Sequence, residues 1–359
     1  MNKSSLWSFN LGLLLPVFVL LIVSLITLFS VDPGLFRNQL LFSAVALIFF
    51  FFFSQSNYKV LEYYRVPIYV VSVGLLILVL VLGIESRGAV RWIELFGFRI
   101  QFSEIIKPFL AISLASYLKD SKNSLLSISR ICLFLFVVSF LIFLQPDLGS
   151  AIVYIFVTLL TLIFFGFPIK FFAGGFLSLV LILPIAFRFL HDYQKQRIMT
   201  FINPTKDPLG TSYNAIQSII AVGSGMFLGK GLGQGTQSTL SFLPERHTDF
   251  IFATISEQLG FVGSLLIILS FVFLLYKIFD LMRNTDDSFS KIFCAISFFI
   301  IFTQFFLNVG MNIGIVPVVG ITLPFVSYGG SSLLSNFVLL GILSSIGKNV
   351  RERKVLEIG

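Results

Sequence analysis

The chain has 359 residues, of which 57% are hydrophobic and 12% are charged, and its mean hydropathy is +0.97. Soluble domains carry about 25% charged residues, so this composition excludes a soluble globular protein and predicts an all-α, polytopic integral membrane protein. The net charge of +8 would suggest nucleic-acid binding in a soluble chain, but here the basic residues form short clusters between apolar segments. Such clusters are typical of membrane topology signals, and we expect no nucleic-acid partner.

Cysteine and histidine are too few to build a disulfide framework or a histidine-based metal cage. Cys132 and Cys294 each lie inside an apolar segment, and the two histidines are His191 and His247. Both kinds of site need more ligands of these types than the chain contains. The sequence therefore predicts neither.

A hydrocarbon core of roughly 30 Å requires about 20 apolar residues in a helix, and this length divides the chain into about ten transmembrane helices. The nine clear candidates are 11–29, 38–54, 66–84, 128–144, 150–166, 170–190, 250–276, 289–311 and 326–347. The tenth, 103–118, carries two charges in its first turns, which leaves a short span and an interfacial helix both open. The first segment resembles a signal peptide, but no small-residue cleavage site follows its long apolar part, so we expect a retained anchor.

The distribution of Lys and Arg predicts the orientation of these helices. With ten spans and a cytoplasmic N-terminus, fourteen basic residues fall on the inner side, and the short outer loops contain only Arg37, Arg87, Arg91 and Arg99. The positive-inside rule then places both termini in the cytoplasm and the long polar loop 190–250, between spans 7 and 8, outside. Because no linker, repeat or soluble segment interrupts the pattern, we expect a single membrane domain over residues 1–359.

The first charged features along the chain lie around the fourth predicted span. Arg87, Arg91 and Arg99 crowd one short outer loop against the positive-inside preference, which indicates an anionic partner such as a phosphate-bearing lipid, or simple contact with lipid headgroups. Glu104 and Lys107 follow, roughly 60° apart around a helix, where acid and base can neutralise one another. An intramembrane pair of this kind indicates a site, and it can equally fix the orientation of a helix.

Two further motifs allow both a structural and a functional interpretation. Asp147, which follows Pro146 in the turn before the sixth span, favours a turn and a helix N-terminus, although it can also be a ligand group. In the long loop, a predicted interfacial helix opens at Tyr213 and ends near Gly223.

Glycines then alternate at Gly229, Gly231, Gly233 and Gly235 around Lys230, without the spacing of a P-loop or a dinucleotide fingerprint. This is either a mobile loop or a segment whose backbone amides approach a large ligand closely.

Asp249 stands directly before the eighth span. As a helix N-cap it would be an ordinary structural residue, together with Thr248. As a carboxylate at a partly dry boundary, where desolvation raises the pKa, it would suit a general base. Glu257 lies eight residues further, about 12 Å deeper along the helix, and is either a second site residue or a buried partner for a base such as Lys107.

The last predicted outer region, 308–330, is apolar and uncharged but rich in helix-breaking residues. Backbone of this kind inside a membrane lines a cavity or packs between helices. A transporter would use it as a broken helix at a substrate site, and a scaffold would use its small residues for close packing.

Together, these stretches resemble the SEDS family of bacterial shape, elongation, division and sporulation proteins, and most closely its elongation branch. The matching motifs are Arg91-Trp92-Ile93, Gln101 to Lys107, Gln145 to Gly149, Asn203-Pro204 with Asp207, Tyr213-Asn214 with Gln217, Gly229 to Gln237, Leu243 to Phe250 and Pro324 to Gly330. The short N-terminus and the Pro244-Glu245-Arg246-His247 segment favour the elongation branch over the division branch. The sequence departs from the family pattern at Phe102, where proline is usual, and at Met226, and neither change removes a reactive group.

The resemblance implies a peptidoglycan glycosyltransferase that polymerises lipid II on the outer face of the bacterial cytoplasmic membrane. Asp249 matches the family's essential aspartate and is expected to deprotonate, directly or through a metal or water, the sugar 4-hydroxyl that attacks the second lipid-linked disaccharide. This attack would expel undecaprenyl pyrophosphate with inversion. Arg91, Lys107 and Lys230 are candidates to balance the pyrophosphate charge, and Glu104 matches a polar family position in the central cavity.

The resemblance also implies partners. Family members work with a class B penicillin-binding protein transpeptidase, and elongation-complex proteins such as MreC and MreD are expected as well. No cofactor is evident, and a divalent cation, Mg²⁺ or Mn²⁺, is compatible with the chemistry.

Two other functions stay open from the residues alone, namely a lipid II flippase and a non-catalytic scaffold of the wall-synthesis complex. A scaffold should tolerate Asp249→Asn, and a flippase should move lipid without making polymer.

Overall fold

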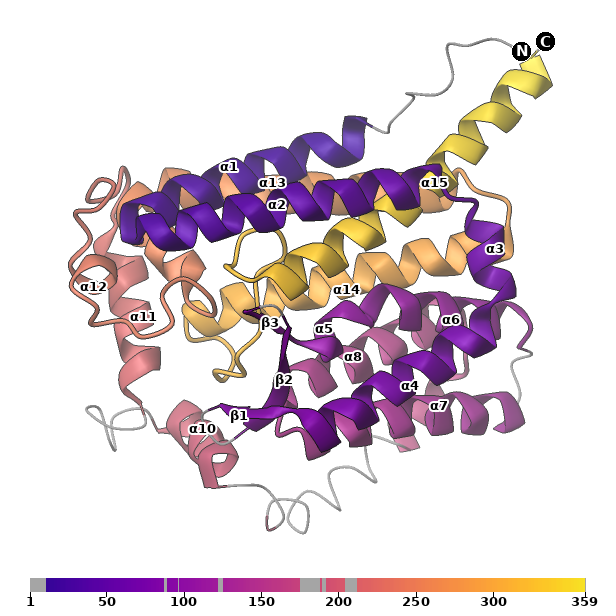
Figure 1. The fold of residues 1–359 in the computed structure, drawn as a ribbon, viewed down its shortest axis with the longest axis horizontal. Coiled ribbons are helices and arrows are strands. Elements are labelled where there is room, and N and C mark those ends of the chain that lie inside the picture. The colour runs from indigo at the N-terminus through magenta and orange to yellow at the C-terminus, as the bar shows by residue number, and fades with distance from the viewer. Residues whose placement is uncertain are drawn as a thin grey trace.

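A computed structural model of the chain describes residues 11–86, 89–95, 97–121, 125–174, 188, 192–203 and 212–358. Most of these residues form helices, which run side by side along the long axis of the molecule (Figure 1). The helices are α1 (Leu11–Val31), α2 (Pro33–Gln55), α3 (Tyr58–Tyr63), α4 (Arg65–Leu82), α5 (Phe102–Ile105), α6 (Lys107–Lys119), α7 (Leu125–Leu144), α8 (Leu148–Phe164), α10 (Asp192–Ile202), α11 (Tyr213–Ser224), α12 (Thr236–Thr239), α13 (Ile251–Arg283), α14 (Ser288–Asn312) and α15 (Gly330–Ile358).

Seven helices among the described residues are long and apolar enough to cross a membrane, which confirms a polytopic membrane protein. They are α1, α2, α4, α13, α14, residues Leu126–Leu144 of α7 and residues Gly330–Val350 of α15. The predicted span 150–166 corresponds to α8, which is apolar but only 17 residues long. The predicted span 170–190 lies mostly outside the described residues, so the expected total of ten stays a prediction.

The predicted span 103–118 is not one helix. It divides at Ile106 into the short α5 and the 13-residue α6, where Pro108 occupies the first turn. Most of α6 is buried, and it packs against α14 and α4. A helix this short is tolerated because protein, rather than lipid, surrounds it.

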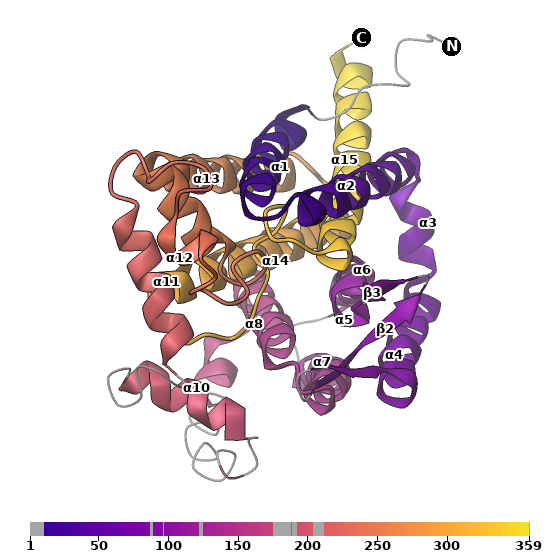
Figure 2. The ribbon, with the colours of Figure 1, turned by 60° about the vertical axis from the view of Figure 1, so that its left-hand side comes forward.

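The core of the bundle is built around α14 and α15. Figure 2 shows these two helices in the middle, with α1, α2, α4, α7 and α11 around them. Buried Phe, Leu and Ile side chains of α1, α2, α13, α14 and α15 contribute to one large apolar cluster. α15 packs along α2, and Gly341 allows the close approach, because a side chain there would meet the Phe50 carbonyl.

A small antiparallel sheet, which the sequence analysis did not predict, follows α4. Strands β1 (Ile84–Ser86), β2 (Ala89–Leu95) and β3 (Phe98–Ile100) are hydrogen-bonded in the order β1-β2-β3. Ile84 pairs with Trp92, and Ile93 pairs with Ile100. The segment that we interpreted only as a charged loop therefore has a rigid backbone, and Arg91 stands on its central strand. Arg87 lies outside the described residues.

The backbone of α13 is interrupted at Gly260, whose φ of 66° and ψ of −157° are not helical. The glycine-rich loop, residues 225–239, lies against this break. Phe261 N and Val262 N donate to the carbonyls of Met226 (2.9 Å) and Phe227 (3.2 Å).

The same loop also bonds to the other side of the break. Lys230 N donates to Glu257 O at 2.9 Å, and Gly231 N donates to Gln258 O at 3.0 Å. Unsatisfied backbone groups in a membrane cost several kcal/mol each, so the loop replaces the hydrogen bonds that the broken helix lacks. The glycines are needed because a side chain at Gly225 or Gly229 would overlap the carbonyls of α13.

Gly229→Ala should lower the free energy of unfolding by about 2 kcal/mol, because Gly229 has a φ of +81° and no room for a Cβ atom. Thermal unfolding of the purified protein measures this. Gly74→Ala in α4 is the matched control, since nothing lies within 4 Å of a Cβ built there. Equal unfolding temperatures for the two variants would contradict the proposed role of the loop.

Candidate functional site

Asp249 is half-buried in the turn that precedes α13. The structure assigns the N-cap position of α13 to Phe250, one residue later, so the N-cap interpretation of Asp249 is not the one observed. The carbonyl oxygen of Asp249 accepts hydrogen bonds from the side-chain amides of Asn308 and Asn312, both at 3.0 Å. These asparagines are completely buried and lie one turn apart on α14.

The three preceding residues are also held through their carbonyl oxygens. Arg246 O accepts from Thr254 Oγ1 at 2.9 Å, His247 O from Tyr328 N at 2.9 Å, and Thr248 O from Ser327 Oγ at 2.7 Å. Four consecutive carbonyls are thus bonded to α13, α14 and the segment between α14 and α15. This many contacts fix the backbone from which the Asp249 carboxylate projects.

Asn312 connects this turn to two further elements. Its Oδ1 accepts a hydrogen bond from Ala253 N at 3.1 Å, and its carbonyl accepts one from Ser218 Oγ of α11 at 3.0 Å. α11 itself matches the helix that we predicted from Tyr213 to near Gly223. A single asparagine therefore joins α11, α13 and α14.

A second polar cluster surrounds Asp147 at the start of α8. Asp147 caps α8 through Ser150 N (3.2 Å), as the turn interpretation predicted, and Oδ2 also accepts from Gln101 Nε2 (2.8 Å) and Ser103 Oγ (3.1 Å). Arg91 Nη1 lies 3.9 Å from Asp147 Oδ1, and the Arg91 side chain is 30% exposed. Arg91 Nε is buried and has no hydrogen-bond partner among the described residues. The guanidinium therefore retains donors for a further acceptor.

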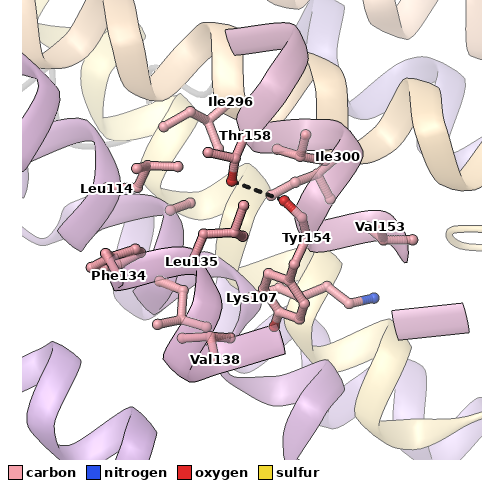
Figure 3. Close-up of a pocket in the computed structure, with 13 residues that line it drawn as sticks. Lys107, Leu114, Phe134, Leu135, Val138, Val153, Tyr154, Thr158, Ile296 and Ile300 are labelled. Carbon is pink, nitrogen blue, oxygen red and sulfur yellow. Dashed lines mark hydrogen bonds between the residues drawn. The ribbon is translucent and has the colours of Figure 1, made fainter. Parts of the chain in front are cut away.

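Glu104 and Lys107 form a buried ion pair at the junction of α5 and α6, as their spacing predicted. Lys107 Nζ donates to Glu104 Oε2 at 2.6 Å, and the two side chains are 3% and 9% exposed. Lys107 also borders an apolar cavity of about 30 Å³ between α6, α7, α8 and α14, where it lies beside Tyr154 (Figure 3). Tyr154 OH donates to Ser103 O at 2.8 Å, which links the cavity wall to the Asp147 cluster.

Glu257 pairs with Lys230 and not with Lys107, so the suggested Lys107 partner is corrected. Lys230 Nζ lies 3.2 Å from Glu257 Oε1, and Glu257 is fully buried. The same carboxylate accepts from Gln237 N (2.9 Å) and Ser238 N (2.8 Å) in the glycine-rich loop. The partner could not be predicted because Lys230 and Glu257 lie 27 positions apart in the sequence.

The segment between α14 and α15 lies between the Asp249 turn and the Asp147 cluster. Ser327 and Tyr328 hold the turn, whereas Ser331, at the start of α15, accepts from Gln101 N at 3.0 Å. A Cβ atom at Gly149 would press against the carbonyls of Val319 and Gly320, so α8 packs directly on this segment. The uncharged, helix-breaking region therefore joins the two polar clusters, as expected of backbone packed between helices.

The structure groups the six predicted site residues in three places. Arg91, Glu104 and Lys107 surround the start of α5 and α6, Lys230 and Glu257 join the glycine-rich loop to α13, and Asp249 lies on the fixed turn. Pro204 and Asp207, which also carried the resemblance, lie outside the described residues.

The roles of Asn308 and Asn312 were not predicted from the sequence. The only sequence signal for them was a pair of amide side chains one helical turn apart in an apolar helix.

No group of three or more His, Cys, Asp or Glu side chains that could hold a metal ion occurs in the described part of the chain.

Asn312→Leu should accelerate amide hydrogen exchange in residues 246–253, because Asp249 O loses one of its two donors and Ala253 N loses its side-chain acceptor. Loss of such buried partners costs about 1–3 kcal/mol of stability. Gln304→Leu is the matched control on α14, because the buried Gln304 amide has no partner within the described residues. Unchanged exchange in Asn312→Leu would contradict the proposed clamp.

Comparison with known proteins gives the same family from sequence and from structure. The family model for the cell cycle proteins FtsW, RodA and SpoVE matches residues 4–352. The peptidoglycan glycosyltransferase MrdB of Escherichia coli is 35% identical over 354 residues, with 96% of both chains covered. Stage V sporulation protein E of Bacillus subtilis is 33% identical over 366 residues, covering 95% of this chain and 98% of that protein.

Two solved structures extend this likeness to the fold. The rod shape-determining protein RodA of Thermus thermophilus has a TM-score of 0.73 at 26% identity, covering 97% of this chain and 98% of that one. A chain from a peptidoglycan synthase complex, described as coordinating polymerization and crosslinking, has a TM-score of 0.83 at 28% identity, covering 96% and 99%. These matches confirm the resemblance that the motifs indicated, and the chain belongs to the FtsW, RodA and SpoVE family of cell cycle proteins.

Proposed function

We propose that this chain is a peptidoglycan glycosyltransferase that polymerises lipid II during cell-wall elongation. The names of the Escherichia coli relative and of several FtsW relatives carry this activity. The observation that carries the proposal is the Asp249 turn, since hydrogen bonds from three parts of the fold to four backbone carbonyls hold the backbone that bears the carboxylate. Catalysis by a general base depends on such positioning.

In this mechanism Asp249 accepts the proton of the sugar 4-hydroxyl on one lipid-linked disaccharide. The oxygen forms a bond to the anomeric carbon of the other disaccharide, and the bond from that carbon to the pyrophosphate oxygen breaks. The bonding electrons leave with the undecaprenyl pyrophosphate, and the anomeric centre is inverted. In this mechanism the protein groups that act are all residues of this chain. A divalent cation, if bound, would neutralise negative charge on the pyrophosphate.

Basic side chains are available to stabilise the leaving group. Arg91 retains unused donors, and Lys230 is 29% exposed at the side chain although it pairs with Glu257. Lys107 is buried with Glu104, and we assign this pair to contacts with polar groups of the substrate. Preorganised cations of this kind stabilise developing negative charge in a poorly solvated site.

We infer the membrane orientation of the chain from its basic residues, and its protein partners from its family. The single membrane domain, residues 1–359, would have both termini in the cytoplasm and its active face outside the bacterial cytoplasmic membrane. A class B penicillin-binding protein would crosslink the new strands, in line with the synthase complex to which the fold is similar. MreC and MreD would belong to the same elongation complex.

Asp249→Asn should reduce glycan-strand formation from labelled lipid II at least about 100-fold, because removal of a general base costs about that much. The assay uses the purified protein with its cognate transpeptidase, and thermal unfolding shows that both forms fold equally. Lipid II movement across vesicles is followed in parallel. Equal polymer from both forms would exclude Asp249 as the base, and lipid movement without polymer would favour a flippase.

A double variant, Glu104→Gln with Lys107→Met, separates the structural role of the buried pair from substrate binding. Each single change leaves a buried charge without its partner, at a cost of about 3–5 kcal/mol, whereas the double change removes both charges and should preserve stability. If the pair binds substrate, kcat/KM of the stable double variant falls about tenfold or more. Wild-type kcat/KM would show that the pair only orients helices.

A further inference from the structure

Gln39 of α2 is a completely buried polar residue with no role in the mechanism described so far. Its amide nitrogen donates to Ser327 O at 3.3 Å, and its amide oxygen accepts from Gly329 N at 3.2 Å. A buried amide without partners costs free energy, and Gln39 satisfies both of its ends on one turn of the segment between α14 and α15. A single side chain of α2 therefore spans the 327–329 turn.

Two further side chains of α2 also contact this turn. Asn38 Nδ2 donates to Tyr328 OH at 3.4 Å, and the centroids of the Phe42 and Tyr328 rings lie 6.0 Å apart. Gly330 packs against the Phe42 ring, because a Cβ atom there would lie 3.0 Å from it. Asn38 and Phe42 are about one helical turn apart, so this part of the chain is seated on one face of α2.

The same turn holds the backbone before Asp249. Ser327 Oγ donates to Thr248 O at 2.7 Å. Tyr328 N donates to His247 O at 2.9 Å, and the centroids of the two rings lie 5.6 Å apart. Two of the four bonded carbonyls of the Asp249 turn thus depend on a segment that α2 holds in place.

We propose that Gln39 is a positioning residue for Asp249 and acts through the 327–329 turn. This inference rests on the proposed glycosyltransferase function, in which Asp249 is the base. Gln39 is fully buried, so it fixes geometry without contacting the substrate. A displacement of about 1 Å in a reacting group can cost about 100-fold in rate, so loss of the Gln39 hydrogen bonds should lower kcat more than it changes KM.

Gln39→Met tests the proposal, because methionine has a similar volume and cannot form either hydrogen bond. We expect kcat for glycan-strand formation to fall at least about tenfold, with KM for lipid II within about twofold of the wild-type value. Ser43→Ala is the matched control, because Ser43 is buried one turn later on α2 and its hydroxyl donates within the helix, to Gln39 O at 2.7 Å. Wild-type kcat in Gln39→Met, or an equal fall in Ser43→Ala, would overturn the proposal.

A double variant shows whether Gln39 acts through the turn. Ser327→Ala removes the donor to Thr248 O and should lower kcat by itself. If both residues act through one turn, the loss in the double variant should be smaller than the product of the two single losses by about threefold or more, because coupled residues are not additive. Losses that multiply would show two independent effects and contradict the proposed route.

Amide hydrogen exchange gives a test that does not depend on activity. The N–H groups of Thr248 and Phe250 both bond to Glu245 O. Gln39→Met should accelerate their exchange about tenfold or more, because their turn loses part of its support, and Ser43→Ala should not. Unchanged exchange would overturn the proposal, whereas faster exchange in a chain that makes no polymer would count only against the glycosyltransferase function.

Gln39→Asn replaces Gln39→Met if the methionine variant does not fold. Its side chain is one methylene shorter, so it keeps an amide but cannot reach both Ser327 O and Gly329 N. The same fall in kcat, by about threefold or more, and the same faster exchange are expected. Wild-type values of both would overturn the proposal.

Discussion

The hydrogen bonds from Asn308 and Asn312 to the carbonyl oxygen of Asp249 determine much of the geometry around this site. Both asparagines are completely buried in α14, so their amides must find partners inside the protein. They find them in the turn before α13, and that turn is also bonded to the segment between α14 and α15. The backbone that bears the Asp249 carboxylate is thereby held rigidly, which the proposed role as a general base requires.

The break in α13 at Gly260 extends this support to the glycine-rich loop. Because the loop supplies hydrogen bonds to both sides of the break, Lys230 on the loop is held beside Glu257, which lies on the half-helix that follows Asp249. The Asp249 turn, Lys230 and Glu257 are therefore parts of one continuous structure.

Much of this architecture could be predicted from local signals. Composition predicted the membrane class, and the rare charges in apolar sequence indicated Glu104, Lys107, Asp249 and Glu257 as candidates. Of these, the pairing of Glu104 with Lys107 is confirmed. Contacts between distant residues could not be predicted in the same way. The side-chain amides of Asn308 and Asn312 bind the carbonyl of Asp249, which lies 59 and 63 positions earlier in the sequence. The strands at 84–100 were not predicted because their charges suggested a loop. The 13-residue α6 can be shorter than a membrane span because neighbouring helices, not lipid, cover it.

A structure of the full chain with its transpeptidase and a non-reactive lipid II analogue would show whether Asp249 is placed to act as the base. We expect the acceptor 4-hydroxyl to lie within hydrogen-bond distance, about 3 Å, of an Asp249 carboxylate oxygen. The hydrogen bonds from Asn308 and Asn312 should persist in that complex. An analogue bound with its 4-hydroxyl remote from Asp249, in a complex competent for polymerisation, would contradict the assignment of this residue as the base.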